Sequence, residues 1–156
     1  MQRRQFFALG ALALPVPCAF AHHGWSSFDQ ERPIYVEGRV VKAAWRNPHV
    51  ELEIDLAPGL TLPSDLSNRA LPAQSAAVDG ARLLARAVLP TRRDSRWVIE
   101  LAPLTRMEAW KVPEVKVGDT LAVHGFTLIG EKGEAVVRAE YLFAGGKTYG
   151  LRSPPA

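Results

Sequence analysis

Residues 50–56 predict the clearest strand of the chain, because apolar side chains alternate there with acidic ones. A period of two puts one face of a strand in the core and the other face in water. The stretch 34–45 is rich in β-branched and aromatic residues and predicts a second strand, with Gly38 as a bend or bulge. Asn47-Pro48 supplies a turn between the two strands, so we expect a hairpin.

Three further apolar stretches predict strands at residues 96–102, 120–129 and 135–144, and the turn at 130–133 joins the last two. Leu104–Trp110 predicts a short helix that begins after Pro103, a residue that suits the first helical position. Five strands with a helix between the third and fourth are typical of a small barrel of the OB type. The sequence therefore predicts a mainly β fold, a five-stranded OB-like barrel with one or two short helices.

Residues 57–95 interrupt this pattern with four prolines. A loop of this length without structure of its own is unusual in a compact domain, so part of it should fold. Asp79 can cap a helix that ends before Pro90. The residues expected on one face of that helix are Ala81, Leu84 and Val88. We expect the rest of 57–95 to form a flexible excursion from the barrel.

Residues 1–21 have the features of a cleavable signal peptide: Arg3-Arg4, an apolar run over 6–20, and Ala19-Phe20-Ala21 as the cleavage pattern. The run is shorter than the about 20 residues of a membrane-spanning helix, so no stable membrane span is expected. Arg3-Arg4-Gln5-Phe6-Phe7 resembles the twin-arginine export signal, although a general secretory signal also tolerates two arginines. We expect cleavage after Ala21, a periplasmic location, and a single domain over 22–156.

Composition limits the choice of partners and chemistry. Two of the 19 basic residues and none of the 16 acidic ones lie in the predicted signal peptide, so the mature charge is close to balanced. This balance gives no reason to expect nucleic acid as a partner. The single cysteine, Cys18, also lies in the signal peptide, so disulfides and thiol chemistry are excluded from the mature domain. Hydrolase, zinc-protease and phosphate-loop motifs are missing from the sequence, which predicts no catalytic residues and no organic cofactor.

His22 and His23 would begin the mature chain. A terminal histidine can chelate a metal through its α-amine and its own ring nitrogen, and a second imidazole completes a nitrogen set that suits copper. A cut before Ala21 would place His23 third, which also chelates Cu(II) or Ni(II). His49, at the mouth of the predicted hairpin, could supply the extra imidazole. The predicted metal ligands are therefore His22, His23 and His49, with copper as the cofactor.

Simpler interpretations of these and other residues remain open. Two histidines after a cleavage site also fit a flexible, solvated segment, and His49 fits a structural position at the start of a strand. Aromatic residues in small β-proteins usually belong to the core, although the four tryptophans could line a groove; these are Trp25, Trp45, Trp97 and Trp110. A basic cluster could bind an anionic polymer but is more typical of a solvated face; its members are Arg82, Arg86, Arg92, Arg93 and Arg96.

The chain resembles the exported bacterial domain-of-unknown-function family 6152. The resemblance depends on four motifs and covers most of the mature chain: His22-His23, Trp45-x-Asn47-Pro48-His49, Trp97-x-x-Glu100-Leu101 and Lys116-x-Gly118-Asp119. It implies a one-domain barrel with unassigned activity, and it groups His22, His23 and His49 in one motif set. The family usually has Ser-Phe after its paired histidines, whereas residues 24–28 here read Gly-Trp-Ser-Ser-Phe, and its turn is shorter than 57–95.

Two functions follow from the sequence. The first is a periplasmic, non-enzymatic binding protein that takes copper at the mature N-terminal histidines. The alternative is a metal-free OB-like module that binds a small cell-envelope ligand or a protein partner through its barrel face and tryptophans. A copper oxidase or oxygenase is a third possibility, but no substrate surface or supporting acid in the sequence favours it.

Overall fold

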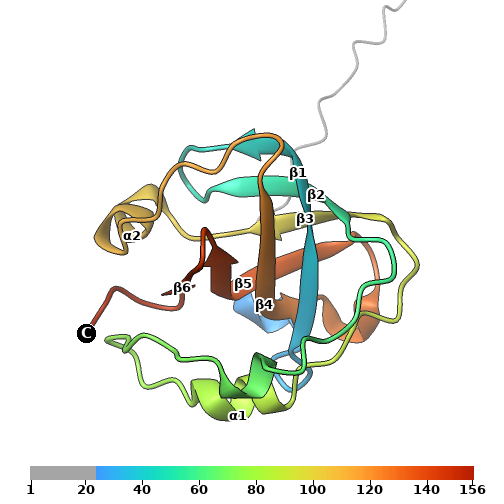
Figure 1. Cartoon of the computed structure of the whole chain (residues 1–156), viewed down its shortest axis with the longest axis horizontal. Helices are drawn as coiled ribbons and strands as arrows, with labels where there is room; N and C mark the ends of the chain where they lie inside the picture. The colour runs from blue at the N-terminus through green and yellow to red at the C-terminus, as the bar shows by residue number, and fades with distance from the viewer. Residues whose placement is uncertain (1–23) are drawn as a thin grey trace, which may run out of the picture.

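The computed structural model describes residues 24–156, and in this part of the chain six strands form one sheet (Figure 1). The strands are β1 (Ile34–Ala44), β2 (Glu51–Leu56), β3 (Arg96–Glu100), β4 (Thr120–Thr127), β5 (Val136–Ala144) and β6 (Lys147–Gly150). Their order is β3-β2-β1-β4-β5-β6, and an additional parallel pairing of β3 with β5 closes the first five into a barrel. The predicted signal peptide, residues 1–21, lies outside the described residues, as do His22 and His23.

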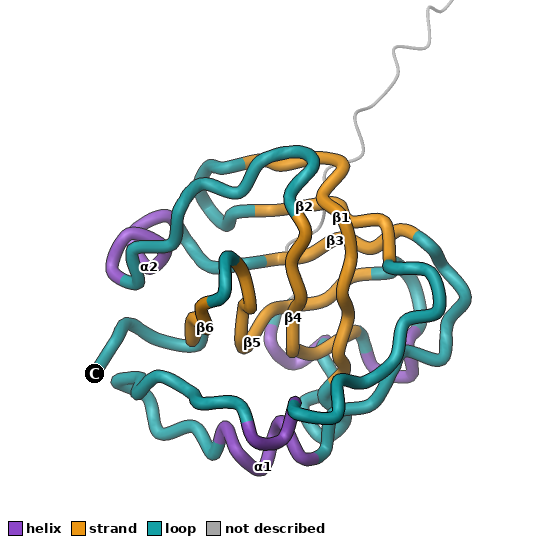
Figure 2. Tube along the Cα trace, in the orientation of Figure 1, coloured by secondary structure: helices purple, strands orange, loops and turns teal. Residues whose placement is uncertain are grey.

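The predicted fold class is confirmed: residues 24–156 are mainly β and form a closed five-stranded barrel, one extra strand and two short α-helices (Figure 2). Helix α2 (Leu104–Ala109) connects β3 to β4, as expected for an OB-like barrel. Pro103 does not occupy the first helical position, because its ψ of 151° makes it the residue that precedes the helix. Strand β6 was not predicted; it is short and follows a tight turn in which Gly145 and Gly146 both have positive φ.

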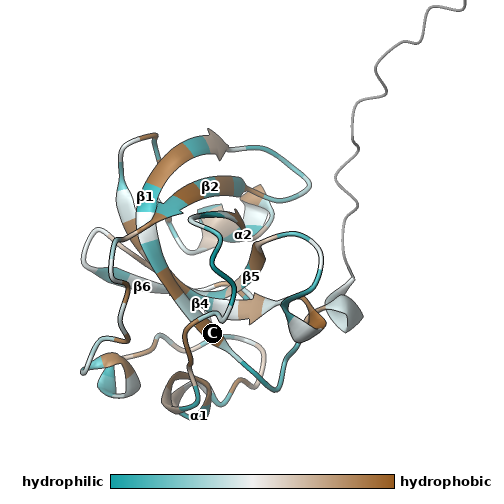
Figure 3. Ribbon diagram, turned by 90° about the vertical axis from the view of Figure 1, so that its right-hand side faces the viewer, coloured by the Kyte–Doolittle hydropathy of each residue, from teal (hydrophilic) through white to brown (hydrophobic). Residues whose placement is uncertain are grey.

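Apolar and polar side chains alternate along the strands, and the apolar ones fill the barrel. Leu52 and Ile54 of β2 are buried, whereas the neighbouring Glu51 and Glu53 are partly exposed, as the period of two predicts. Figure 3 shows hydrophobic residues interspersed with hydrophilic ones along β1 and β2. Trp97 of β3 is fully buried in this core. The interior of the barrel is therefore packed with apolar side chains.

Gly38 serves close packing and does not form the bulge that the sequence suggested. It pairs directly with Leu56, and the register shift in β1 lies further on, between Val40 and Lys42. A Cβ atom on Gly38 would lie 2.1 Å from the backbone oxygen of Asp55. The glycine is therefore required because β2 approaches β1 too closely for any side chain.

Residues 57–95 pack against the outside of the barrel (Figure 1). They contain the 3-10 helix η2 (Leu66–Asn68) and the helix α1 (Gly80–Ala85). Asp79 caps α1 as predicted, because its side chain accepts a hydrogen bond of 3.1 Å from the backbone N–H of Arg82. The apolar side chains that join the segment to the barrel are Leu66 and Leu84 on one side and Tyr35, Ala122 and Tyr141 on the other.

Val88 differs from the prediction, which placed it on the apolar face of the helix. It lies beyond α1, and 36% of its surface is exposed. Its backbone pairs with the start of β1 instead: it donates to the Pro33 oxygen at 3.0 Å and accepts from the Tyr35 N–H at 2.9 Å. The segment is thus attached to the barrel by backbone hydrogen bonds, and the flexibility of its remaining parts stays a prediction.

Within residues 24–156, neither helix has the length and apolar character that crossing a bilayer would require.

Candidate functional site

Trp25 lies near the start of the described residues, two positions after His23 in the sequence. It begins the 3-10 helix η1 (Trp25–Ser27), and 37% of its surface is exposed. The guanidinium of Arg152 lies over its ring at 4.2 Å from the centroid, and that of Arg138 lies 5.1 Å away. The rings of Phe28 and Phe126 meet it edge to face at 6.4 and 6.3 Å. These cation–π and aromatic contacts attach residues 25–28 to the outer face of the barrel, and we call these residues the N-terminal anchor.

A buried ion pair lies beneath this anchor. Glu100 of β3 and Arg138 of β5 are direct partners in the parallel strand pair that closes the barrel. Arg138 donates to one carboxylate oxygen of Glu100 from Nε at 2.9 Å and from the terminal nitrogen Nη2 at 2.6 Å. The Arg138 guanidinium also lies 4.3 Å from the centroid of Phe28. One arginine therefore connects the barrel closure to the N-terminal segment.

A second buried carboxylate, Glu140, contacts the same anchor. Its side chain is fully buried, and Arg152 donates to its Oε2 from Nε at 2.8 Å. Its other oxygen, Oε1, has no hydrogen-bond partner within the described residues. Burial raises the pKa of Glu140, and the charge of Arg152 only partly opposes this effect. Arg152 thus bridges a buried acid and the exposed Trp25 ring.

His124 is a structural histidine in the interior of the protein. It is fully buried in β4, and its Nε2 lies 3.1 Å from the backbone oxygen of Leu83. Its Nδ1 has no partner in the part of the chain that the structure describes. Burial lowers its pKa to about 4, although the hydrogen bond to Leu83 favours the charged form. The ring is therefore neutral at pH 7 and donates its Nε2–H to the Leu83 oxygen.

His49 is half-buried and follows a cis peptide bond between Asn47 and Pro48. Asn47 belongs to the turn and also connects it to α2, because its Oδ1 accepts a hydrogen bond of 3.2 Å from the N–H of Leu104, the first residue of that helix. The next residue, Val50, pairs by backbone hydrogen bonds with Leu101 and Ala102. In residues 24–156, no group of three or more histidine, cysteine or acidic side chains is arranged to hold a metal ion.

A continuous run of contacts leads from Trp25 to the strand that follows His49. Trp25 and Phe28 contact Arg138, Arg138 pairs with Glu100, and Glu100 lies directly opposite Glu51 in the β2–β3 pair. Directly opposite residues of an antiparallel pair lie on the same face of the sheet. The N-terminal anchor and the start of β2 therefore belong to one side of the barrel.

The tryptophans do not form a common groove. Trp97 is buried in the barrel, and Trp45 and Trp110 pack against the same core. Trp25 is the exposed one, and it contacts arginines and phenylalanines. The interpretation of tryptophans as core residues therefore holds for three of the four.

The predicted arginine cluster is largely occupied by ion pairs, which supports the interpretation of a solvated face. Arg86 pairs with Glu31, Arg92 with Asp94, and Arg96 with Asp55. No role for Glu100, Arg138, Glu140 or Arg152 was predicted from the sequence, although Glu100 belongs to one of the family motifs. A signal for two of them existed, because Arg138 and Glu140 are the charged residues in the otherwise apolar strand β5.

A sequence model described as a family of unknown function (DUF6152) matches residues 11–60. The matched stretch includes His22-His23 and the motif from Trp45 to His49, and it ends before the motifs at Trp97 and Lys116. The match is therefore shorter than the resemblance expected over most of the mature chain. No curated protein matches the chain.

Proposed function

We propose that this protein is an exported, non-enzymatic module that binds copper at its mature N-terminus, starting from the match of residues 11–60 to the model of domain-of-unknown-function family 6152. Cleavage after Ala21 in the periplasm would free the α-amine of His22. That amine and the ring of His22 would chelate one copper ion, and His23 or His49 would add a further imidazole. The amine loses its proton readily, because its ordinary pKa is about 7.7 to 8.0.

The observation that carries this proposal is the anchoring of Trp25, three residues after His22. An extended chain spans at most about 3.3 to 3.6 Å per residue, so this separation would limit how far an amine freed at His22 could lie from Trp25. The contacts from Trp25 through Arg138 and Glu100 lead toward the start of β2, and His49 lies two residues before Glu51. This arrangement supports His49 as an additional ligand and His22 as the main one.

The proposed role is binding without catalysis. The buried acids near the anchor, Glu100 and Glu140, are each paired with an arginine. Uptake or buffering of copper needs only the amine and the imidazoles, which are the ligands named here.

The decisive experiment compares copper binding by three forms of the protein. The first begins at His22, as verified by intact mass after secretion; the second carries Gly-Ser before His22; the third is the His49→Ala variant that begins at His22. Cu(II) affinity is measured by competition with a chromophoric chelator, and the ligand set by electron paramagnetic resonance. We expect the extended form to lose most of its affinity, because its amine is no longer beside the ring of His22.

Two results would contradict the proposal. Equal affinity of the extended and processed forms would exclude the amine as a ligand. A secreted protein that begins after His23 would remove the site altogether. If His49→Ala and the parent protein have equal affinity, His49 is not a copper ligand, but the chelate at His22 is not contradicted.

A further inference from the structure

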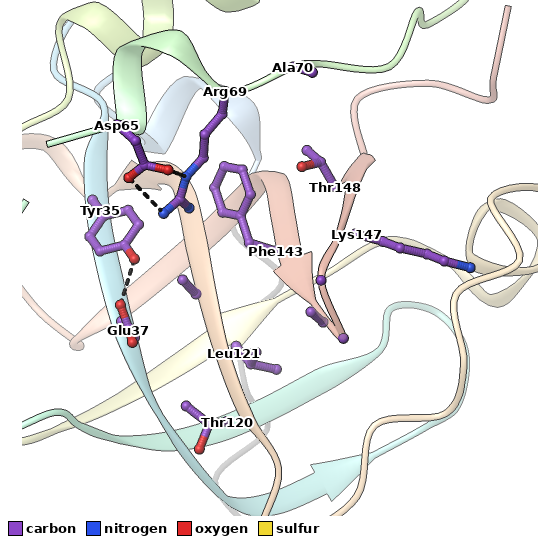
Figure 4. A pocket seen from close by; sticks show the side chains of 14 residues that line it. Tyr35, Glu37, Asp65, Arg69, Ala70, Thr120, Leu121, Phe143, Lys147 and Thr148 are labelled. Carbon is purple, nitrogen blue, oxygen red and sulfur yellow. Dashed lines mark hydrogen bonds and ion pairs between the residues drawn. The ribbon is translucent and has the colours of Figure 1, made fainter. Parts of the chain in front are cut away.

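A cavity lies between the outer face of the barrel and the 3-10 helix η2 (Figure 4). Its volume is about 520 Å³. This volume falls in the range of roughly 300 to 1,000 Å³ that is typical of small-molecule sites. The strands β1, β4, β5 and β6 contribute its floor, and the segment that contains Asp65 and Arg69 contributes a wall.

The strand register explains why the surface is hollow here. Glu37, Ala122, Phe143 and Thr148 are successive partners across the four strands and form one row. Neighbouring strands are about 4.8 Å apart, so the row crosses a width suited to one or two sugar-sized rings. The small side chain of Ala122 lies between the larger Glu37 and Phe143, which leaves the floor of the cavity open.

Glu37 is held in a defined orientation by Tyr35. The two residues are two apart in β1, so both side chains lie on the outer face. The hydroxyl of Tyr35 donates to Oε2 of Glu37 at 2.6 Å. Burial and the neighbouring Glu37 raise the pKa of Tyr35, so the hydroxyl keeps its proton and stays a donor. The other carboxylate oxygen of Glu37, Oε1, has no hydrogen-bond partner among residues 24–156 and is available to a ligand.

The positive charge of Arg69 is already compensated. Its Nε lies 3.1 Å from one oxygen of Asp65 and its terminal nitrogen Nη2 lies 3.4 Å from the other. The same guanidinium lies over the ring of Phe143, 4.8 Å from the centroid. Lys147 extends away from the other side chains in Figure 4. Lys147 also lines the cavity, but among the other lining side chains the carboxylate of Glu37 is the charge without an ion-pair partner within residues 24–156.

This charge pattern selects the kind of ligand. A phosphate or carboxylate would meet Glu37 and find Arg69 occupied by Asp65, so anions are disfavoured. A purely apolar ligand would leave Glu37 and Asp65 without water or partners. A divalent metal ion would find Glu37, which already accepts a hydrogen bond from Tyr35, and Asp65, which is already paired with Arg69. An ammonium group instead forms a charge-assisted hydrogen bond with Oε1 of Glu37 and gains from nearby aromatic rings.

We propose that this cavity binds the protonated primary amine of a small organic ligand, with the ammonium group on Glu37 and the body of the ligand beside Phe143. The hydroxyl groups of Thr120 and Thr148 line the cavity and can meet polar groups on the same ligand. Amino sugars and linear diamines share this chemistry. The site requires no metal and no free N-terminus, so it is independent of the copper proposal.

The test is an NMR titration of the ¹⁵N-labelled processed protein in metal-free buffer with glucosamine, glucose or putrescine. Glucose matches glucosamine in its ring and lacks the amine, whereas putrescine has amines without a ring. We expect glucosamine to shift the amide signals of Ala122, Gly146 and Thr148, and glucose at the same concentration to leave them unchanged. If putrescine shifts these signals as much as glucosamine does, the amine is sufficient for binding. If putrescine shifts them less, the sugar ring also contributes to binding.

Variants distinguish recognition by Glu37 from general charge attraction. Glu37→Gln should weaken glucosamine binding by about tenfold or more, because a charge-assisted hydrogen bond is lost. Glu108→Gln removes an exposed acid from α2 and should leave binding unchanged. Tyr35→Phe should weaken binding several-fold while Glu37 keeps its charge, because the carboxylate loses its fixed orientation. Equal shifts with glucose, unchanged binding by Glu37→Gln, or no shifts with either amine would overturn the proposal.

Discussion

Glu100 and Arg138 face each other across the parallel strand pair that closes the barrel, and their side chains form a buried ion pair with a shortest distance of 2.6 Å. Arg138 also stacks on Phe28 and lies close to Trp25. The same arginine thus takes part in two tasks, barrel closure and attachment of the N-terminal segment. Loss of either partner would leave a charge buried without its counterion.

We expect Glu100→Ala and Arg138→Ala each to lower the free energy of unfolding by about 3 to 5 kcal/mol. The double replacement Glu100→Leu with Arg138→Met should recover much of this loss, because no unpaired charge remains. Lys42→Ala is the control, since it breaks an exposed ion pair with Glu53 and should cost about 1 kcal/mol or less. Denaturant unfolding of the mature protein measures all four; equal costs for Arg138→Ala and Lys42→Ala would contradict this account.

Much of the barrel could be predicted from the sequence because its strands are long and regularly patterned. The alternation in β2 and the β-branched residues of β1 specify both the strands and their inward faces. The short strand β6 could not be found in this way, because four residues give too little periodicity. The pairing of Val88 with β1 was also missed, since it arises from tertiary contact and leaves no local pattern.

Gly38 provides a direct test of the packing between β1 and β2. We expect Gly38→Ala to destabilise the protein by about 1 to 3 kcal/mol, because the new methyl group would overlap the Asp55 backbone, which cannot easily move. Gly24→Ala is the matched control, since the nearest atom to its Cβ would be 3.7 Å away. Thermal unfolding of both variants measures the effect. If the two melting temperatures are equal, the strands are not as close as described.

The candidate sites were harder to predict than the fold. The paired histidines could be singled out in the sequence because the predicted cleavage pattern would place them at a terminus. Glu37, Arg69 and Phe143 belong to three distant parts of the chain, and only the register and the folding of 57–95 over the barrel bring them together. Arg138 and Glu140 could have been noticed as charges in an apolar strand, but their partners Glu100 and Arg152 depend on the closed barrel.

His124 should make stability depend on pH. Its ordinary pKa is about 6.5, and burial lowers it to about 4 in the folded protein. Between these values the unfolded chain binds a proton that the folded protein does not. The stabilisation is therefore fully present above about pH 6.5 and is lost as the pH falls toward 4, by roughly 3 kcal/mol at most.

The measurement compares unfolding free energies of the parent protein and His124→Gln across pH 4 to 7. We expect the difference between them to shrink as the pH falls, because glutamine does not titrate. Glu140 has the opposite sign, since its raised pKa gives stability that is lost as the pH rises. It is present in both proteins, so its effect cancels in the difference. Parallel pH profiles would show that His124 is not the titrating group.

If the N-terminal anchor places the terminal histidines near the start of β2, the effects of replacing Trp25 and His49 on Cu(II) affinity should not be additive. We expect Trp25→Ala and His49→Ala each to weaken Cu(II) affinity by roughly tenfold, because each removes the same additional imidazole from reach. The double variant should then be no weaker than either single variant, which is the signature of one shared interaction. Ile129→Ala is the control, because it also removes an exposed apolar side chain and should leave the affinity unchanged. All proteins must begin at His22, as checked by intact mass, and the affinities are measured by chelator competition. Additive losses in the double variant would mean that Trp25 and His49 act separately, and the anchor would then have no part in placing the metal ligands.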